Sequence, residues 1–170
     1  GTGVIPRNMY SYGAKWTGAD ISENQIMYAE KLSKSAGMDI DYIVASAEAV
    51  DYPDRTFDVI TACQCFMYFD KSIVLPKFHQ MLKNHGHFAI LFMAWLPEES
   101  EIAKTSEDLV LKYNPAWTGG RVTRYELQEP PWCEGMFKAA NMLTYELPVH
   151  FTRESWHGRM KACRGIGASG

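Results

Sequence analysis

The 170-residue sequence lacks the features that mark membrane, secreted and metal-binding proteins. Its longest apolar stretch, residues 88–96, is much shorter than the roughly 20 residues that a membrane-spanning helix needs. Its four cysteines form neither close pairs nor a zinc pattern with the histidines, so we expect reduced thiols and no metal. No signal peptide occurs in these residues, and we expect a cytoplasmic protein.

An excess of charge of one sign is also lacking. The formal net charge is −3, which gives no basic field for nucleic acid or an anionic membrane. Hydrophobic residues make up 46% and charged residues 22%, the balance of an ordinary globular domain. We therefore expect one domain over residues 1–170 with a small-molecule partner and no nucleic-acid or membrane partner, and a homodimer is left open.

What is present is an alternation of short apolar runs with helical patterns, which predicts a parallel sheet with crossover helices. We expect Pro76 near the start of its helix, where a proline costs least. The run 57–63 is nearly all apolar and should be covered on both faces. Strands are predicted at 15–20, 41–45, 57–63, 87–93 and 142–151, helices at 22–36, up to 82, 100–113 and 152–164, a turn at 84–86, and an irregular substrate-side segment at 114–141.

Polar residues and glycines follow successive predicted strands. Gly1-Thr2-Gly3 precedes the first, Asp20 ends it, and residues 46–48 and 63–70 follow the next two. Because the carboxyl ends of parallel strands meet at one edge, these positions should share a crevice. A carboxylate at the position of Asp20 can accept both hydroxyls of a ribose. Taken alone, Asp20 is better explained as a strand-end turn residue, and the flanking pattern is what favours the binding role.

The run GTG…GADIS…ASAEAVDYPDRTFDVITACQCFMYFD…LKNHGHFAIL resembles class I methyltransferases of the UbiE-like, type 11 group. The resemblance covers about residues 1–93. It implies an α/β, Rossmann-like, mostly parallel sheet with helices on both faces, a C-terminal helical or irregular cap, and S-adenosyl-L-methionine as cofactor. The family's first strand and the start of its glycine loop would precede Gly1, so we expect a longer protein or a second chain that supplies them.

The resemblance also implies roles for individual positions. Ser46 stands where the family usually has an acidic residue, which changes the contact to the adenine amino group. The implied cofactor-binding residues are Gly1 and Gly3 at the methionine part, Asp20 at the ribose, Ile21 at the adenine face, Ser46, Ala47 and Glu48 at the adenine edge, and Cys63 and Gln64 beside the methionine.

The acceptor side is predicted more loosely. Met67 and Tyr68 would lie near the transferred methyl, or belong to the core. Methyl transfer needs no protein nucleophile, and a base is required only if the acceptor must lose a proton; Tyr68 and His157 are the candidates. Trp156 and Arg159 would bind an acidic small molecule, the alternative being a solvated helix face.

Two other functions stay open from the sequence. An NAD-type oxidoreductase could use a similar glycine loop and acidic strand end. A non-catalytic Rossmann-like fragment or binding module could keep the fold without the chemistry.

Overall fold

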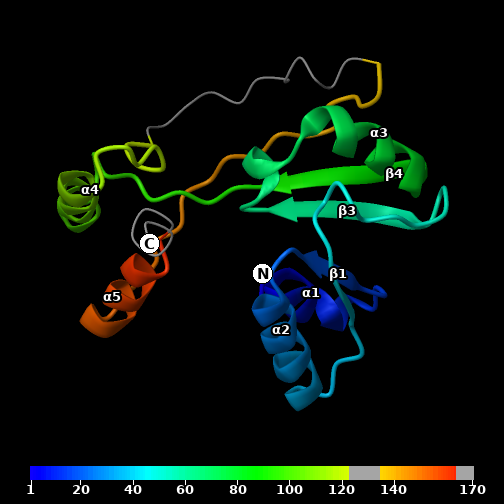
Figure 1. The fold of residues 1–170 in the computed structure, drawn as a ribbon, viewed down its shortest axis with the longest axis horizontal. Coiled ribbons are helices and arrows are strands. Elements are labelled where there is room, and N and C mark those ends of the chain that lie inside the picture. The colour runs from blue at the N-terminus through cyan, green and yellow to red at the C-terminus, as the bar shows by residue number, and fades with distance from the viewer. Residues whose placement is uncertain (123–134, 164–170) are drawn as a thin grey trace. The chain divides into compact units, whose positions relative to one another are not determined.

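The computed structural model describes residues 1–122 and 135–163 (Figure 1). The chain divides into two compact units, here called the first unit (residues 1–92 and 132–138) and the second unit (residues 93–131 and 139–170). Every described strand belongs to the first unit, and the described helices of the second unit are α4 and α5. In chain order the first unit contains α1 (Val4–Met9), a 3₁₀ turn (Tyr10–Tyr12), β1 (Thr17–Asp20), α2 (Glu23–Ser35), β2 (Asp41–Val44), β3 (Phe57–Cys63), a 3₁₀ turn (Phe66–Tyr68), α3 (Lys71–Met81) and β4 (Leu82–Leu91).

Parallel strand pairing is the frame of the first unit. β1 pairs with β2 and β3 pairs with β4, both in parallel, which confirms the predicted α/β class. The described strands form two pairs rather than one continuous sheet, because no ladder of hydrogen bonds joins β1 or β2 to β3 or β4.

The helix after β1 begins and ends where its sequence predicts. The Ser22 side chain caps α2 by accepting the Gln25 backbone N–H at 3.4 Å. The Ser22 N–H donates to Asp20 at 2.8 Å, so the strand-end carboxylate, rather than the Gln25 side chain, completes the cap. Gly37 follows the helix with a φ of +66°, the left-handed conformation that favours glycine at a helix end.

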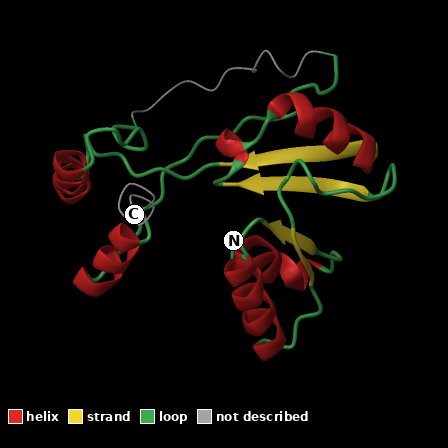
Figure 2. Cartoon of the chain, viewed as in Figure 1, coloured by secondary structure: helices red, strands yellow, loops and turns green. Residues whose placement is uncertain are grey.

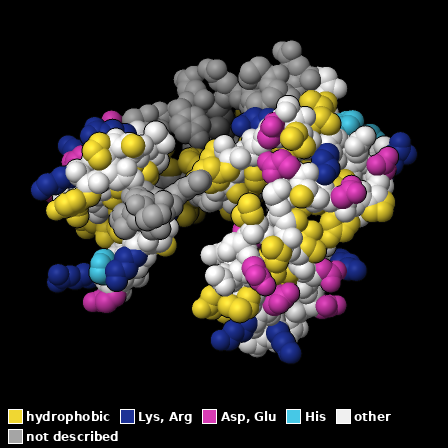
Figure 3. All heavy atoms as spheres, viewed as in Figure 1, with side chains coloured by type: hydrophobic (Ala, Val, Ile, Leu, Met, Phe, Trp, Pro, Cys, Tyr) yellow, Lys and Arg dark blue, Asp and Glu magenta, His cyan; other side chains and the backbone are white. Residues whose placement is uncertain are grey.

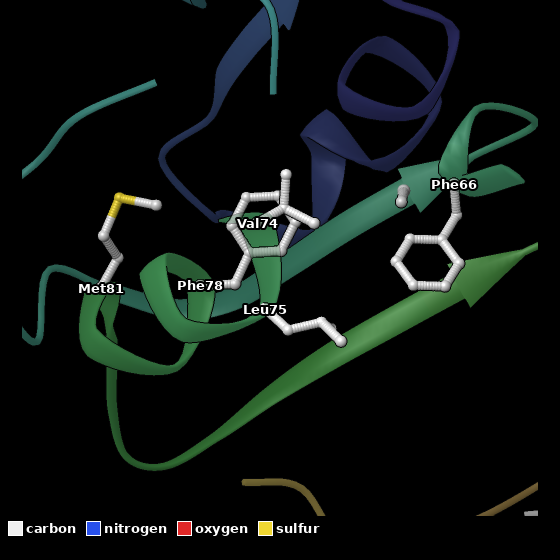
Figure 4. Packing of buried hydrophobic residues seen from close by; sticks show 6 residues of the cluster. Phe66, Val74, Leu75, Phe78 and Met81 are labelled. Atoms are coloured by element: carbon white, nitrogen blue, oxygen red, sulfur yellow. The ribbon is translucent and has the colours of Figure 1, made fainter. Parts of the chain in front are cut away.

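The core of the first unit lies between α3 and the β3–β4 pair (Figure 4). Phe88 of β4 meets Phe78 of α3 edge-on at 5.3 Å between ring centroids, and meets Phe66 at 5.4 Å. Such rings each contribute about 1.5–3 kcal/mol when fully buried. Because Phe66 belongs to the loop after β3, this packing holds that loop against α3 and β4. The buried cluster consists of Ala62, Phe66, Val74, Leu75, Phe78 and Met81.

Pro76 lies in the middle of α3, so its predicted place near the helix start was wrong. The helix begins earlier because Asp70 caps it, accepting the Ser72 N–H at 3.0 Å. A proline at this position leaves the carbonyl of Ser72 without its usual helical donor, a cost that the buried face of α3 offsets.

The predicted turn at 84–86 is also corrected, since these residues belong to β4. His85 has a φ of +66°, and the register of β3 against β4 shifts between Phe57 and Val59. An irregularity of this kind absorbs a turn-like sequence within a strand. The strand then ends at Leu91 instead of residue 93.

One face of the β3–β4 pair is open in the described residues. Val59 is 51% exposed and Leu91 is 40% exposed, whereas Ala62 on the other face is buried under α3. The expectation that β3 is covered on both faces is therefore not met within this unit.

Two capped helices are the regular elements of the second unit (Figure 2). α4 (Glu101–Tyr113) begins after Ser100, and α5 (Arg153–Lys161) begins after Thr152; each cap side chain accepts a backbone N–H. Both starts agree with the sequence. Residues 114–122 and 135–141 contain no helix or strand, as expected, while 123–134, with Cys133 and Trp132, and 164 lie outside the described residues.

The strand predicted at 142–151 is wrong for this structure. The segment contains no strand, and Leu143 and Tyr145 are each 74% exposed. Alternating apolar residues become a strand only when a neighbour accepts their backbone hydrogen bonds, and no described strand pairs with them. Pro148 also removes one donor.

The described surface is mixed in character. Acidic and basic side chains are interspersed on the face shown in Figure 3, with apolar atoms between them. Among the helices that the structure describes, none has both the length and the apolar composition needed to cross a bilayer.

Candidate functional site

The carboxyl ends of β1 and β2 lie side by side. Asp20 is in register with Val44, and the Ala45 N–H donates to the backbone carbonyl of Asp20 at 3.0 Å. Residues 46–48 follow at once along the chain. The structure therefore brings Asp20 and the loop at 46–48 to the same end of one strand pair.

Both oxygens of the Asp20 carboxylate have partners. Oδ1 accepts the Ser22 N–H at 2.8 Å, and Oδ2 pairs with the amino group of Gly1. The side chain is 24% exposed, and its neighbour Ile21 is 76% exposed. A carboxylate at a strand end, beside an exposed apolar side chain, is suited to the hydroxyls of a ribose and the face of an adenine.

The loop after β2 is tied down by its own residues. Ser46 accepts a backbone N–H three residues on at 3.2 Å, and Ala47 packs against the core of the first unit. Glu48 accepts the Asp70 N–H at 2.9 Å, and this bond is the largest cause lowering the pKa of Glu48. Glu48 thus joins the loop to the start of α3, while the Ala45 N–H bond keeps the start of the loop at the end of β1.

The loop after β3 starts with a left-handed residue. Gln64 has a φ of +59°, and its N–H donates to the carbonyl of Leu91 at 3.0 Å. Cys63 is exposed and Cys65 is half-buried; burial raises the pKa of the Cys65 thiol, and the neighbouring Cys63 adds to this. A non-glycine residue in this conformation marks a sharply specified turn at the strand end.

Met67 and Tyr68 lie on the 3₁₀ turn that follows. They are 48% and 61% exposed, while Phe66 on the same turn is buried in the core. The reading of Met67 and Tyr68 as core residues is therefore excluded, and both side chains face outward from the turn.

The glycine segment at 1–3 adjoins these loops. Burial lowers the pKa of the Gly1 amino group, and the nearby Cys65 thiol partly offsets this. The Gly1 amino group also pairs with the Asp20 carboxylate at the end of β1. Gly3 has a φ of +71° and is the N-cap of α1.

Sequence reasoning missed three residues that organise this edge. Tyr42 of β2 lies across Gly3 and Gly18, Asp70 holds Glu48, and Lys77 donates to the Glu48 carbonyl at 2.7 Å. A glycine inside a short strand, such as Gly18, was the available signal, because it often marks close approach of another group.

The predicted acceptor-side residues of α5 belong to the second unit. The Trp156 indole donates to Ser106 of α4 at 3.0 Å, and its ring meets Trp95 at 5.6 Å. The Arg159 guanidinium lies 4.9 Å from the centre of the Trp95 ring. Trp95 thus links Trp156 and Arg159, while His157 is exposed on the same helix.

The second unit also contains a cavity of about 440 Å³. Glu107 in its wall is 2% exposed and is already engaged by the Trp95 indole at 2.5 Å and the Arg121 N–H at 2.7 Å. The wall of the cavity contains both acidic and basic side chains, so the lining favours neither anions nor cations. The lining residues are Pro97, Glu98, Lys104, Glu107, Asp108 and Arg121.

Parallel strands with an acidic strand end and a glycine segment define a Rossmann-like nucleotide-binding class of domain. Residues 1–90 match the Methyltransf_11 family, described as a methyltransferase domain, and the chain belongs to this family. The family is S-adenosylmethionine-dependent, so S-adenosylmethionine is the cofactor that it implies.

Curated relatives agree with this assignment. The chain is 28% identical over 121 residues to ubiquinone biosynthesis O-methyltransferase of Pseudomonas entomophila, which covers 69% of this chain and 52% of the relative. It is 32% identical over 76 residues to the ubiquinone/menaquinone C-methyltransferase UbiE of Escherichia coli O1:K1, covering 43% and 30%. The chain thus spans about half the length, or less, of the curated relatives it matches.

The PH0226 protein of Pyrococcus horikoshii has a similar fold, with a TM-score of 0.52 and 24% identity. The similarity covers 65% of this chain and 50% of that one. At this level of identity the likeness supports the fold alone.

Proposed function

We propose that this chain is the cofactor-binding part of an enzyme that transfers a methyl group from S-adenosylmethionine to a small-molecule acceptor. The observation that carries the proposal is the meeting of Asp20 and the Ser46–Ala47 loop at one end of the β1–β2 pair. That arrangement offers a carboxylate for a sugar next to apolar and backbone groups for a base.

Each part of the cofactor then has a partner. Oδ2 of Asp20, which pairs with the Gly1 amino group in this structure, would accept from the ribose hydroxyls, while Oδ1 stays bound to the Ser22 N–H. The exposed Ile21 would cover the adenine, with Ser46 and Ala47 at its edge. The remaining residues, which would flank the methionine part, are Gly1, Gly3, Cys63 and Gln64.

The bound cofactor supplies an electrophilic methyl group on a positively charged sulfur. The chain therefore has to hold the acceptor in line and exclude water, and it needs no nucleophile of its own. Met67 and Tyr68 face outward beside the β3 loop and would contact the acceptor. Where the acceptor must lose a proton, Tyr68 would accept it.

We infer further that the acceptor is acidic. Arg159 is exposed and packs on Trp95, and among the described residues no carboxylate pairs with it. A guanidinium held by an aromatic ring is well suited to a carboxylate ligand. Arg159→Ala should lower turnover of acidic acceptors relative to neutral ones, and unchanged selectivity would remove this inference.

Calorimetry on the full chain tests the cofactor. S-adenosylhomocysteine and NAD are titrated separately into the same preparation. Binding of S-adenosylhomocysteine without NAD supports the proposal. Binding of NAD alone would favour an oxidoreductase, and binding of neither would favour a non-catalytic domain.

A further inference from the structure

Tyr42 lies across two glycines of the first unit. It is the register partner of Gly18 on β1. A Cβ added to Gly18 would lie 2.8 Å from the ring carbons Cδ1 and Cε1, closer than real Cβ atoms approach. A Cβ added to Gly3 would overlap the Tyr42 hydroxyl oxygen and lie 2.9 Å from Cζ. The Tyr42 ring therefore fills the space that side chains at both positions would need.

The Tyr42 hydroxyl is held in place by a hydrogen bond. It lies 2.9 Å from Oγ of Ser33 on α2, and Ser33 is only 2% exposed. A bond to a buried side chain fixes the direction of the ring as well as its depth. One side chain of β2 thus contacts β1, the N-cap of α1 and the buried side of α2.

Gly3 depends on this support. Its φ of +71° is a conformation that few residues other than glycine adopt, and its carbonyl accepts the Arg7 N–H at 3.2 Å to start α1. The rest of the segment is tied at its outer side, by the Gly1–Asp20 pair and by the Arg7 guanidinium to the Thr2 carbonyl. The Tyr42 hydroxyl lies against Gly3 on the side that faces the interior of the first unit.

We propose that Tyr42 is a positioning residue, whose hydroxyl holds Gly3 and the backbone of residues 1–3 in the place where they receive the methionine part of the cofactor. This rests on the proposed function for its ligand, although the placement of the backbone itself does not. Misplacing a binding group by about 1 Å is costly in a site that works by orientation.

Two substitutions separate positioning from stability. Tyr42→Phe and Ser33→Ala remove the same hydrogen bond, so both should lower the melting temperature to a similar extent. Only Tyr42→Phe also removes the oxygen atom that lies over Gly3. Tyr28→Phe, an exposed tyrosine on α2, is the matched control.

The first measurement is the dissociation constant for S-adenosylhomocysteine, taken well below the melting temperatures. Tyr42→Phe should weaken binding about 5-fold, Ser33→Ala less than about 2-fold, and Tyr42→Ala more than about 20-fold, the range expected from losing one contact or a whole supporting ring. Equal constants for Tyr42→Phe and Ser33→Ala would overturn the proposal.

The second measurement is hydrogen exchange in the ligand-free protein, followed at the Arg7 amide. Exchange faster in Tyr42→Phe than in Ser33→Ala supports the positioning role, and equal exchange overturns it, whether or not the ligand binds. Failure of the unsubstituted chain to bind S-adenosylhomocysteine would instead refute the proposed function.

Discussion

The substitution Asp20→Asn distinguishes the roles of the two carboxylate oxygens, because it keeps one acceptor oxygen and replaces the other with an NH₂ group. The amide oxygen can still accept the Ser22 N–H, which now lies 2.8 Å from Oδ1, so the cap of α2 is retained. The NH₂ group replaces Oδ2 and cannot accept from a ribose hydroxyl. Hydrogen bonds to a charged group contribute about 1.5–3 kcal/mol, so a loss of about 2 kcal/mol should weaken S-adenosylhomocysteine binding about 30-fold.

The assay is titration calorimetry, with thermal unfolding on the same samples. Asp41→Asn is the control, because Asp41 lies on β2 opposite Thr17, at the other end of the same strand pair, and its side chain is 61% exposed. We expect Asp41→Asn to leave affinity unchanged. Asp20→Asn should lower the melting temperature only slightly, because the Gly1–Asp20 pair that it weakens is exposed. Equal affinity of Asp20→Asn and the unsubstituted chain would refute the reasoning.

Three further predictions concern the stability of the described units. Phe78→Ala should lower the free energy of unfolding by about 3–4 kcal/mol in denaturant titration, because a 6%-exposed ring of the core is lost; a loss below about 1 kcal/mol would contradict the described packing. The pKa of Glu48 is lowered chiefly by the Asp70 N–H, so the ionised side chain stabilises the fold fully above its ordinary pKa of 4.5, and this stabilisation is lost as the pH falls through the lower folded pKa. Glu48→Gln should therefore reduce the change of the urea unfolding midpoint between pH 6 and about pH 3. An unchanged pH dependence in the variant would count against the bond. Glu107→Ala should destabilise the second unit by about 2–4 kcal/mol, followed by tryptophan fluorescence, because the Trp95 indole and a loop amide lose their acceptor; a loss within 0.5 kcal/mol, about the effect of an ordinary surface change, would show that these donors find other partners.

Features fixed by neighbouring residues could be predicted from the sequence. Ser22, Ser100 and Thr152 each cap a helix because the acceptor and the N–H it binds lie within three residues. The order of β1, α2, β2, β3, α3 and β4 followed from hydrophobic periodicity in the same way, whereas α1 was not predicted. The end of α2 at Gly37 is equally local.

Features that depend on residues far apart in the chain could not be predicted. The bond between Glu48 and the Asp70 N–H could not be predicted, because the two residues are 22 positions apart. Nothing near Tyr42 in the sequence indicates that its ring covers Gly3, and the alternation at 142–151 does not reveal that the segment lacks a neighbouring strand. Pro76 was misplaced because the local cost of a proline was weighed without the packing that offsets it.

Amide chemical shifts of the ¹⁵N-labelled chain during titration with S-adenosylhomocysteine test the central idea most directly, namely that the ends of β1 and β2 hold the two halves of adenosine. We predict that the largest changes fall together on residues 20–22 and 46–48, with little change along α4. Saturable changes that leave both stretches unmoved, or no changes at millimolar ligand, would contradict the account.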